Sequence, residues 1–139
     1  MSRKEKRPAS AQPASDEPRP STLFELRYTP DAAGDIRRLD GSVRKQLRKI
    51  LEKKLAVDAE GYGVPLRASL AGYWKHRFAD HRVIYRIYPA YRMVVVCSVG
   101  MRKQGDAEDI YRRLESVANT GRLAEQLASV LKHLLAEKK

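Results

Sequence analysis

Three short apolar runs between residues 72 and 99 constrain the fold more than any other part of this sequence. The runs span 72–78, 82–88 and 92–99, and the links between them, 79–81 and 89–91, are polar or turn-forming. Links this short join antiparallel neighbours, because a parallel connection needs a crossover of a dozen residues or more. The third run is apolar nearly throughout, as is typical of a strand covered on both faces. The sequence therefore predicts an antiparallel sheet with this strand in its interior.

Two helices are predicted ahead of these runs. Thr29 followed by Pro30 is a helix start, a hydroxyl cap with proline in the first turn, and predicts a helix over 30–39. Ser42 is predicted to cap a second helix over 43–58, because the apolar residues there recur every three or four positions. Its other faces are strongly basic, which fits either a solvated surface or a docking surface for RNA or an acidic partner.

The remaining elements complete an α+β pattern. A strand-like run comes first, at 23–28, and helices follow the sheet at 107–117 and 120–136. The order β-α-α-β-β-β-α-α predicts a small antiparallel sheet with the two N-terminal helices packed on it.

Composition divides the chain into three parts. Residues 1–22 hold four of the seven prolines and almost no large apolar side chain, so they are predicted to be a disordered tail. Order is expected from Leu23, with one domain over 23–118 and an amphipathic C-terminal helix within 119–139. A chain of 139 residues with 42% hydrophobic residues can build one core.

The charge balance points to polyanions. The chain carries 28 Lys and Arg against 17 Asp and Glu, a net charge of +11, and residues 23–118 account for +7 of it. Such an excess attracts nucleic acid, although it also fits a role in solubility.

The longest apolar stretch, Met93–Cys97, is far shorter than the roughly 20 residues of a membrane-spanning helix. A single cysteine excludes a disulfide framework, and no apolar segment follows the basic start, so we expect a cytoplasmic protein.

Four cations are the candidate site. Alternation along a strand places Lys75 and Arg77 on one face of the first run and Trp74 on the other, core-facing side. Arg82, at the start of the next run, is predicted to project on the face of Lys75 and Arg77, and Arg102 follows the third run. Like charges repel, and exposed charges contribute little to stability. A cluster of this kind is therefore expected to bind phosphates.

Other chemistry has little support in the sequence. The three histidines lack the spacing of metal ligands, so neither a metal nor another cofactor is predicted. His81 lies in the turn beside Arg82 and is a candidate for phosphate contact. Arg44, Lys45 and Arg48, on the basic face of the second helix, are candidate RNA-binding residues.

Several segments together resemble the RelE family of bacterial toxins, within the RelE/ParE superfamily. They are Ser42–Leu47, Tyr73–Arg77, Arg82–Tyr85, Ser98–Arg102 and Tyr111–Arg113. The resemblance covers residues 23 to 117. No single segment is diagnostic of the family, and the resemblance depends on all of the segments occurring in this order. It implies a toxin of a type II toxin–antitoxin system: a metal-independent endoribonuclease, or mRNA interferase, which cleaves mRNA on the ribosome to inhibit translation. It also implies a cognate antitoxin, with mRNA and the ribosome as the other partners, and no membrane.

The resemblance further implies roles for five residues. Lys75 or Arg77 helps the 2′-OH to lose its proton, Arg82 stabilises the phosphorane, Arg102 assists the leaving group, and Tyr111 orients a base. Two departures matter. Arginine at 77 is a poor proton acceptor, which leaves Lys75 or Tyr111 as the base, and the insertion 103–109 separates Tyr111 from Arg102.

Two other functions remain open. A ParE-like toxin would share the fold but bind DNA gyrase without cutting RNA, and such toxins generally lack the basic cluster. A non-catalytic RNA-binding module would show salt-sensitive binding without strand scission.

Overall fold

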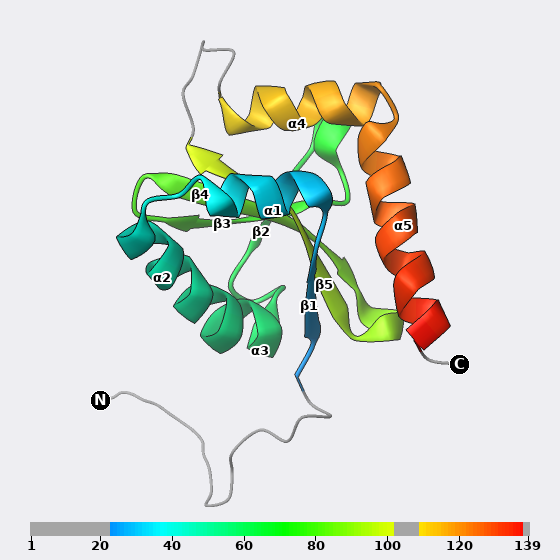
Figure 1. Cartoon of the computed structure of the whole chain (residues 1–139), viewed down its shortest axis with the longest axis horizontal. Coiled ribbons are helices and arrows are strands. Elements are labelled where there is room, and N and C mark those ends of the chain that lie inside the picture. The colour runs from blue at the N-terminus through cyan, green and yellow to red at the C-terminus, as the bar shows by residue number, and fades with distance from the viewer. Residues whose placement is uncertain (1–22, 102–108, 138–139) are drawn as a thin grey trace, which may run out of the picture.

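The computed structural model describes residues 23–101 and 109–137, and Figure 1 shows the arrangement of the elements. The predicted tail, 1–22, lies outside the described residues. The strands are β1 (Glu25–Tyr28), β2 (Val64–Pro65), β3 (Trp74–Phe78), β4 (His81–Tyr88) and β5 (Met93–Met101). The helices are α1 (Pro30–Arg37), α2 (Gly41–Ile50), α3 (Ala56–Asp58), α4 (Ile110–Asn119) and α5 (Arg122–Glu137).

The sheet has the strand order β1-β5-β4-β3-β2. The prediction of an antiparallel arrangement for β3, β4 and β5 is confirmed, and the two connections pass through left-handed backbone at Ala79 and Arg92. The α+β class with two early helices is confirmed as well. The sheet as a whole is mixed, because β1 runs parallel to β5, and the short strand β2 adds an edge beyond β3.

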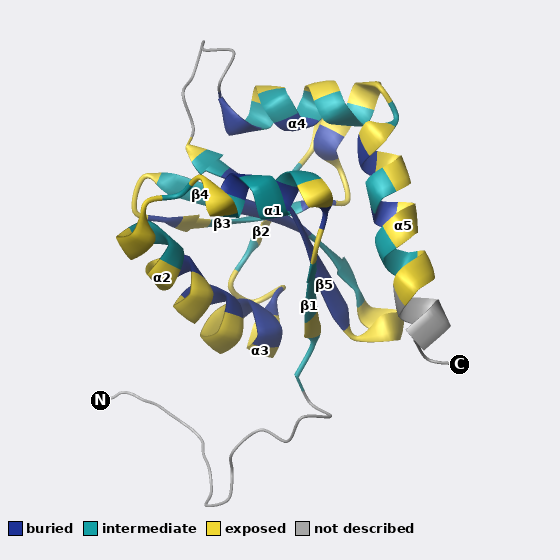
Figure 2. Ribbon diagram, viewed as in Figure 1, coloured by how far each residue is buried: buried dark blue, intermediate teal, exposed yellow. Residues whose placement is uncertain are grey.

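Each face of the sheet is covered by its own pair of helices. On one face, Val94 and Val96 of β5 pack with α1, α2 and the segment that follows α2. On the other face, Val95 and Cys97 pack with α4 and α5. The first seven residues of β5 are all buried, which confirms the prediction of an interior strand and appears as dark blue in Figure 2.

A bulge in β5 changes this alternation near its end. Ile84 of β4 lies opposite Ser98 and Tyr85 lies opposite Val96, so Cys97 is an extra residue in β5. Beyond the bulge, Val99 packs on the same face as Val96, although strict alternation would put it on the other. The bulge therefore re-phases the strand just before the segment that leads to Arg102.

The early helices form where the sequence predicts them, with one difference in capping. Thr29 caps α1, and its hydroxyl accepts a hydrogen bond from the Ala32 amide. The second helix begins at Gly41 rather than after Ser42, so Ser42 is not its cap; its hydroxyl instead donates to the Asp40 carboxylate. A π-helical turn, Leu51–Leu55, joins α2 to α3 in one continuous helical segment.

Within the part of the chain that the structure describes, no helix has both the length and the apolar character needed to cross a membrane.

Candidate functional site

Three of the predicted catalytic residues share one face of the β3–β4 hairpin. Arg77 lies directly opposite Arg82, and Lys75 lies two residues before Arg77, opposite Ile84. Ile84 belongs to the core under α4 and α5, which identifies this as the face that those helices partly cover. Arg77 is exposed, whereas Lys75 and Arg82 are half-buried. The structure therefore brings these three cations together.

None of these three cations forms an ion pair with a carboxylate among residues 23–101 and 109–137; the ion pairs there involve other arginines. Within the described part of the chain, Arg82 donates only a long hydrogen bond, 3.5 Å, to the Asp80 carbonyl. Like charges directly opposite one another destabilise a sheet. A group of cations without carboxylate partners on one face of the sheet would stabilise an anion bound there.

Tyr111 reaches this group from α4. The Lys75 ammonium nitrogen lies 5.7 Å from the centre of the Tyr111 ring, within the range of a cation–π contact. Asp109 positions the start of the helix, because its carboxylate accepts hydrogen bonds from the Tyr111 and Arg112 amides. The insertion 103–109 thus does not keep Tyr111 away from the cations. Arg102 lies outside the described residues.

Arg86 is a cation of this face that we did not predict. It follows Arg82 and Ile84 at alternate positions of β4, so the strand period alone could have identified it. Its guanidinium lies over the rings of Tyr73 and Tyr88, 5.1 and 5.7 Å from their centres. Burial raises the pKa of Tyr73 above its ordinary value of 10.0. The phenol therefore stays neutral beside the arginine at physiological pH.

His81 lies on the opposite face from Arg82. Its ring stacks on Phe78, with the ring centres 5.5 Å apart, and Phe78 belongs to the core under α1 and α2. His76 also lies on that face, and its Nδ1 donates to the Tyr62 carbonyl at 2.7 Å. Neither ring joins the cation cluster, and among the described residues no three His, Cys, Asp or Glu side chains are grouped like metal ligands.

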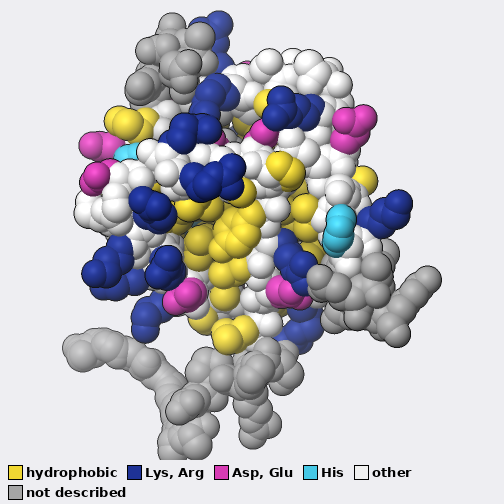
Figure 3. Space-filling model, viewed as in Figure 1, with side chains coloured by type: hydrophobic (Ala, Val, Ile, Leu, Met, Phe, Trp, Pro, Cys, Tyr) yellow, Lys and Arg dark blue, Asp and Glu magenta, His cyan; other side chains and the backbone are white. Residues whose placement is uncertain are grey.

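The predicted RNA-binding residues of α2 lie in the other helical layer, on the far side of the sheet from Lys75. Lys45 and Arg48 are exposed, and the Arg44 guanidinium donates to the Leu39 carbonyl at 3.2 Å. Arg44 and Arg48, with Arg37, line a hollow of about 360 Å³ whose other walls are mainly apolar. The apolar residues of this β1–α2 groove are Leu26, Tyr28, Ala33, Ile36, Leu47 and Leu51. Figure 3 shows an apolar hollow on this side of the molecule with Lys and Arg side chains around it.

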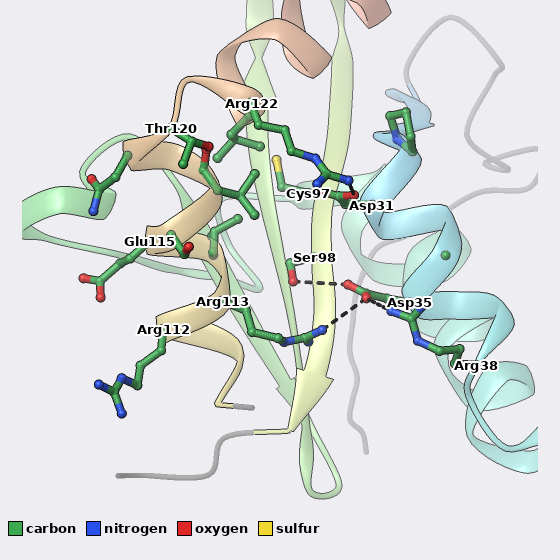
Figure 4. A pocket seen from close by; sticks show the side chains of 17 residues that line it. Asp31, Asp35, Arg38, Cys97, Ser98, Arg112, Arg113, Glu115, Thr120 and Arg122 are labelled. Carbon is green, nitrogen blue, oxygen red and sulfur yellow. Dashed lines mark hydrogen bonds and ion pairs between the residues drawn. The ribbon is translucent and has the colours of Figure 1, made fainter. Parts of the chain in front are cut away.

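A second hollow, of about 970 Å³, separates α1 from α4 over the end of β5. Asp35 of α1, only 7% exposed, is its central polar residue, and its carboxylate accepts hydrogen bonds from the Ser98 hydroxyl, the Val99 amide and the guanidinium groups of Arg38 and Arg113. Figure 4 shows Asp35 and Arg113 pointing toward one another from opposite sides of β5. The sequence gives no local sign of this network, because the residues are far apart in the chain.

Comparison with known proteins agrees with this architecture. The model of the family described as the ParE toxin of type II toxin–antitoxin system, parDE, matches residues 26–106, whereas no curated protein matches the sequence. The toxin–antitoxin complex RelBE2 from Mycobacterium tuberculosis is 27% identical, with a TM-score of 0.56, over 58% of this chain and 93% of that chain. A mutant E. coli RelE toxin in complex with the antitoxin peptide RelBc is 25% identical, with a TM-score of 0.50, over 61% and 90% of the two chains.

The isolated E. coli RelE toxin shows the same fold at 24% identity and a TM-score of 0.50, over 70% of this chain and 98% of that chain. The family match covers more than half of the sequence and includes β3, β4 and β5, which carry Lys75, Arg77 and Arg82. The chain belongs to the ParE toxin family of type II toxin–antitoxin systems, within the RelE/ParE superfamily.

Proposed function

We propose that this toxin is a metal-independent endoribonuclease that cleaves mRNA on the ribosome and so inhibits translation. The observation that carries the proposal is the group of Lys75, Arg77 and Arg82 on one sheet face, without a carboxylate partner among the described residues and with Tyr111 against Lys75. Cleavage of RNA at the 2′-OH needs a proton acceptor, donors for the phosphorane, and an acid for the leaving 5′ oxygen. These side chains supply such groups without a metal.

The chemistry of each side chain suggests its role. A guanidinium stays charged, so Arg77 and Arg82 bind the phosphate and stabilise the negative charge that develops on it. Lys75 or Tyr111 then takes the proton from the 2′-OH. Arg102 is proposed, from the family resemblance alone, to assist the leaving group.

The partner that we propose is a cognate antitoxin with both apolar and acidic side chains. The RelBE2 structure is a toxin–antitoxin complex, and the E. coli RelE mutant is bound to an antitoxin peptide. The β1–α2 groove offers apolar walls with Arg37, Arg44 and Arg48 on its rim. An amphipathic segment would bury its apolar side in this groove and place carboxylates against the arginines.

The ParE identity of the matching family model favours a second function, the binding of DNA gyrase without RNA cleavage. The two functions make different demands on the β3–β4 face. Gyrase binding makes no use of cations around a phosphate, whereas phosphoryl chemistry is accelerated by positioned donors that stabilise the developing negative charge.

The test is to add the purified toxin to a translating extract and to map the 5′ ends of translated and untranslated transcripts, with and without EDTA. We expect cuts within translated frames that persist in EDTA and disappear in Arg82→Ala, while Lys132→Ala, an exposed cation of α5, cuts normally. Intact transcripts together with inhibited gyrase supercoiling would support the second function. Salt-sensitive RNA binding without cuts would indicate a non-catalytic module.

A further inference from the structure

The helix that carries Tyr111 is tied to α1 across an open edge of the sheet. β1 pairs with β5 only as far as Val96, so the remainder of β5 has no strand on that side among the described residues. There the Val99 amide, which a neighbouring strand would otherwise bind, donates a hydrogen bond of 3.0 Å to the Asp35 carboxylate of α1. The same carboxylate receives Arg113 of α4, with the Asp35 Oδ1 and the Arg113 Nη1 3.4 Å apart.

Gly100 leaves room for the Arg113 guanidinium in this position. A Cβ atom at residue 100 would lie 2.5 Å from the Arg113 Nη2, closer than real Cβ contacts, while its next neighbour, the Ile110 Cβ, would be at an ordinary 3.6 Å. The backbone at Gly100 is not in the left-handed region, so alanine is compatible with its conformation. The Arg113 guanidinium therefore occupies the space that a side chain at residue 100 would fill, and alanine there would displace it.

The positions of these residues on α4 connect the tie to the candidate site. Ile110 and Leu114 are buried and face the sheet. At about 100° per residue, Tyr111 and Arg113 lie on opposite flanks of that buried stripe. Tyr111 reaches toward Lys75 on one flank, and Arg113 reaches over the edge of β5 on the other. Rotation of α4 about its axis would therefore move both side chains at once.

Burial of apolar surface is not directional, so the packing of Ile110 and Leu114 fixes such a rotation less sharply than a polar contact does. A charge-assisted hydrogen bond is directional. Asp35 can serve as a fixed point, since it is buried and bound to the main chain of β5 as well as to Ser98. Arg113 is thus a directional contact between α4 and this fixed point.

We propose that Asp35 and Arg113 are positioning residues, which hold α4 so that the Tyr111 ring lies against the Lys75 ammonium group. The proposed role in catalysis rests on the proposed RNA cleavage, whereas the positioning itself does not. A tie of this kind acts on the geometry of the reacting groups, so its loss should lower the catalytic rate more than the binding of RNA.

The experiment uses the NMR signals of the Lys75 side chain in protein with ¹³C-labelled lysine, without RNA. The ring of Tyr111 shifts these signals, and Tyr111→Leu gives their position when the ring is absent. We expect Gly100→Ala and Arg113→Gln, which disturb the tie without removing Asp35, to move the Lys75 signals most of the way to that position. Arg112→Gln, a neutralised exposed neighbour on α4, should leave them unchanged.

Arg113→Lys restores a cation at this position and should recover part of the shift. In the cleavage assay, Gly100→Ala and Arg113→Gln should lower kcat about fivefold with KM nearly unchanged. If the Lys75 signals stay at the wild-type position in both folded variants, the positioning proposal is wrong. If they move but the wild-type toxin cuts no RNA, the positioning stands and the proposed function fails.

Discussion

The cross-strand pair of Arg77 and Arg82 predicts a variant that is more stable and less active than the wild type. The two arginines lie directly opposite one another, with Lys75 two residues away on the same face. Like charges in this arrangement destabilise the sheet. Arg77→Glu replaces the repulsion by attraction to both neighbours, and Arg77→Gln removes the repulsion only.

The magnitude follows from the geometry. Two unit charges about 7 Å apart in water interact by about 0.6 kcal/mol, and Arg77 is exposed, so solvent screening reduces this value. We therefore expect Arg77→Gln to raise the free energy of unfolding by about 0.5 kcal/mol and Arg77→Glu by about 1 kcal/mol. For a domain of this size, the larger change corresponds to about 3 °C in Tm.

The assay is urea unfolding at low and high salt, together with RNA cleavage. At an ionic strength of about 0.5 M the screening length falls below about 5 Å, so the advantage of Arg77→Glu over Arg77→Gln should shrink by more than half. Cleavage should be lost in Arg77→Glu, because a carboxylate repels the phosphate. The reasoning is refuted if Arg77→Glu is no more stable than Arg77→Gln at low salt, or if its advantage does not change with salt.

Three further predictions concern buried groups and are checked by urea unfolding. Tyr85→Phe should cost about 1–2 kcal/mol, because the phenol donates to the Ala59 carbonyl at 2.7 Å; an unchanged midpoint would contradict this. Thr29→Val should cost about 2 kcal/mol, since the hydroxyl caps Ala32 and contacts the Cys97 carbonyl, whereas Thr29→Ser should retain most of the stability. Burial raises the pKa of the Cys97 thiol from 9.0 to about 12. The stability that the neutral thiol contributes is complete below pH 9 and is lost as pH rises toward 12. At pH 10 the free energy of unfolding of the wild type should therefore have fallen by about 1.4 kcal/mol more than that of Cys97→Ala. Equal losses in the two proteins would contradict this.

Local sequence patterns were sufficient to predict the β3–β4 hairpin and the face of the sheet on which its cations lie. The three apolar runs and their short links predicted the antiparallel pairing of β3, β4 and β5. Strand alternation predicted that Lys75, Arg77 and Arg82 would share a face. The same alternation places His81 with Val83 on the core side, as the structure has it, so the candidate for phosphate contact beside Arg82 lies on the other face of the sheet.

Contacts between distant segments could not be predicted in this way. The parallel pairing of β1 with β5 joins strands about 70 residues apart, and neither strand carries a signal for its partner. The contact of Asp35 with Arg113 depends on the gap at Gly100 and on the end of β1 at Tyr28, which are properties of the assembled sheet. Tyr111 was a candidate only through the family resemblance, and its distance from Lys75 required the packing of α4.

The bulge at Cys97 gives β5 an unequal tolerance to different kinds of change. Substitution of one apolar residue by another alters only local packing. Deletion of Cys97 would leave Ser98 opposite Ile84 and Val99 opposite Val83, so each later side chain of the strand would keep its present face. Insertion of one more residue would instead turn the side chains beyond it to the other face of the sheet. Libraries that shorten this strand by the bulge residue should therefore still yield folded toxin, whereas libraries that lengthen the strand by one residue should yield little.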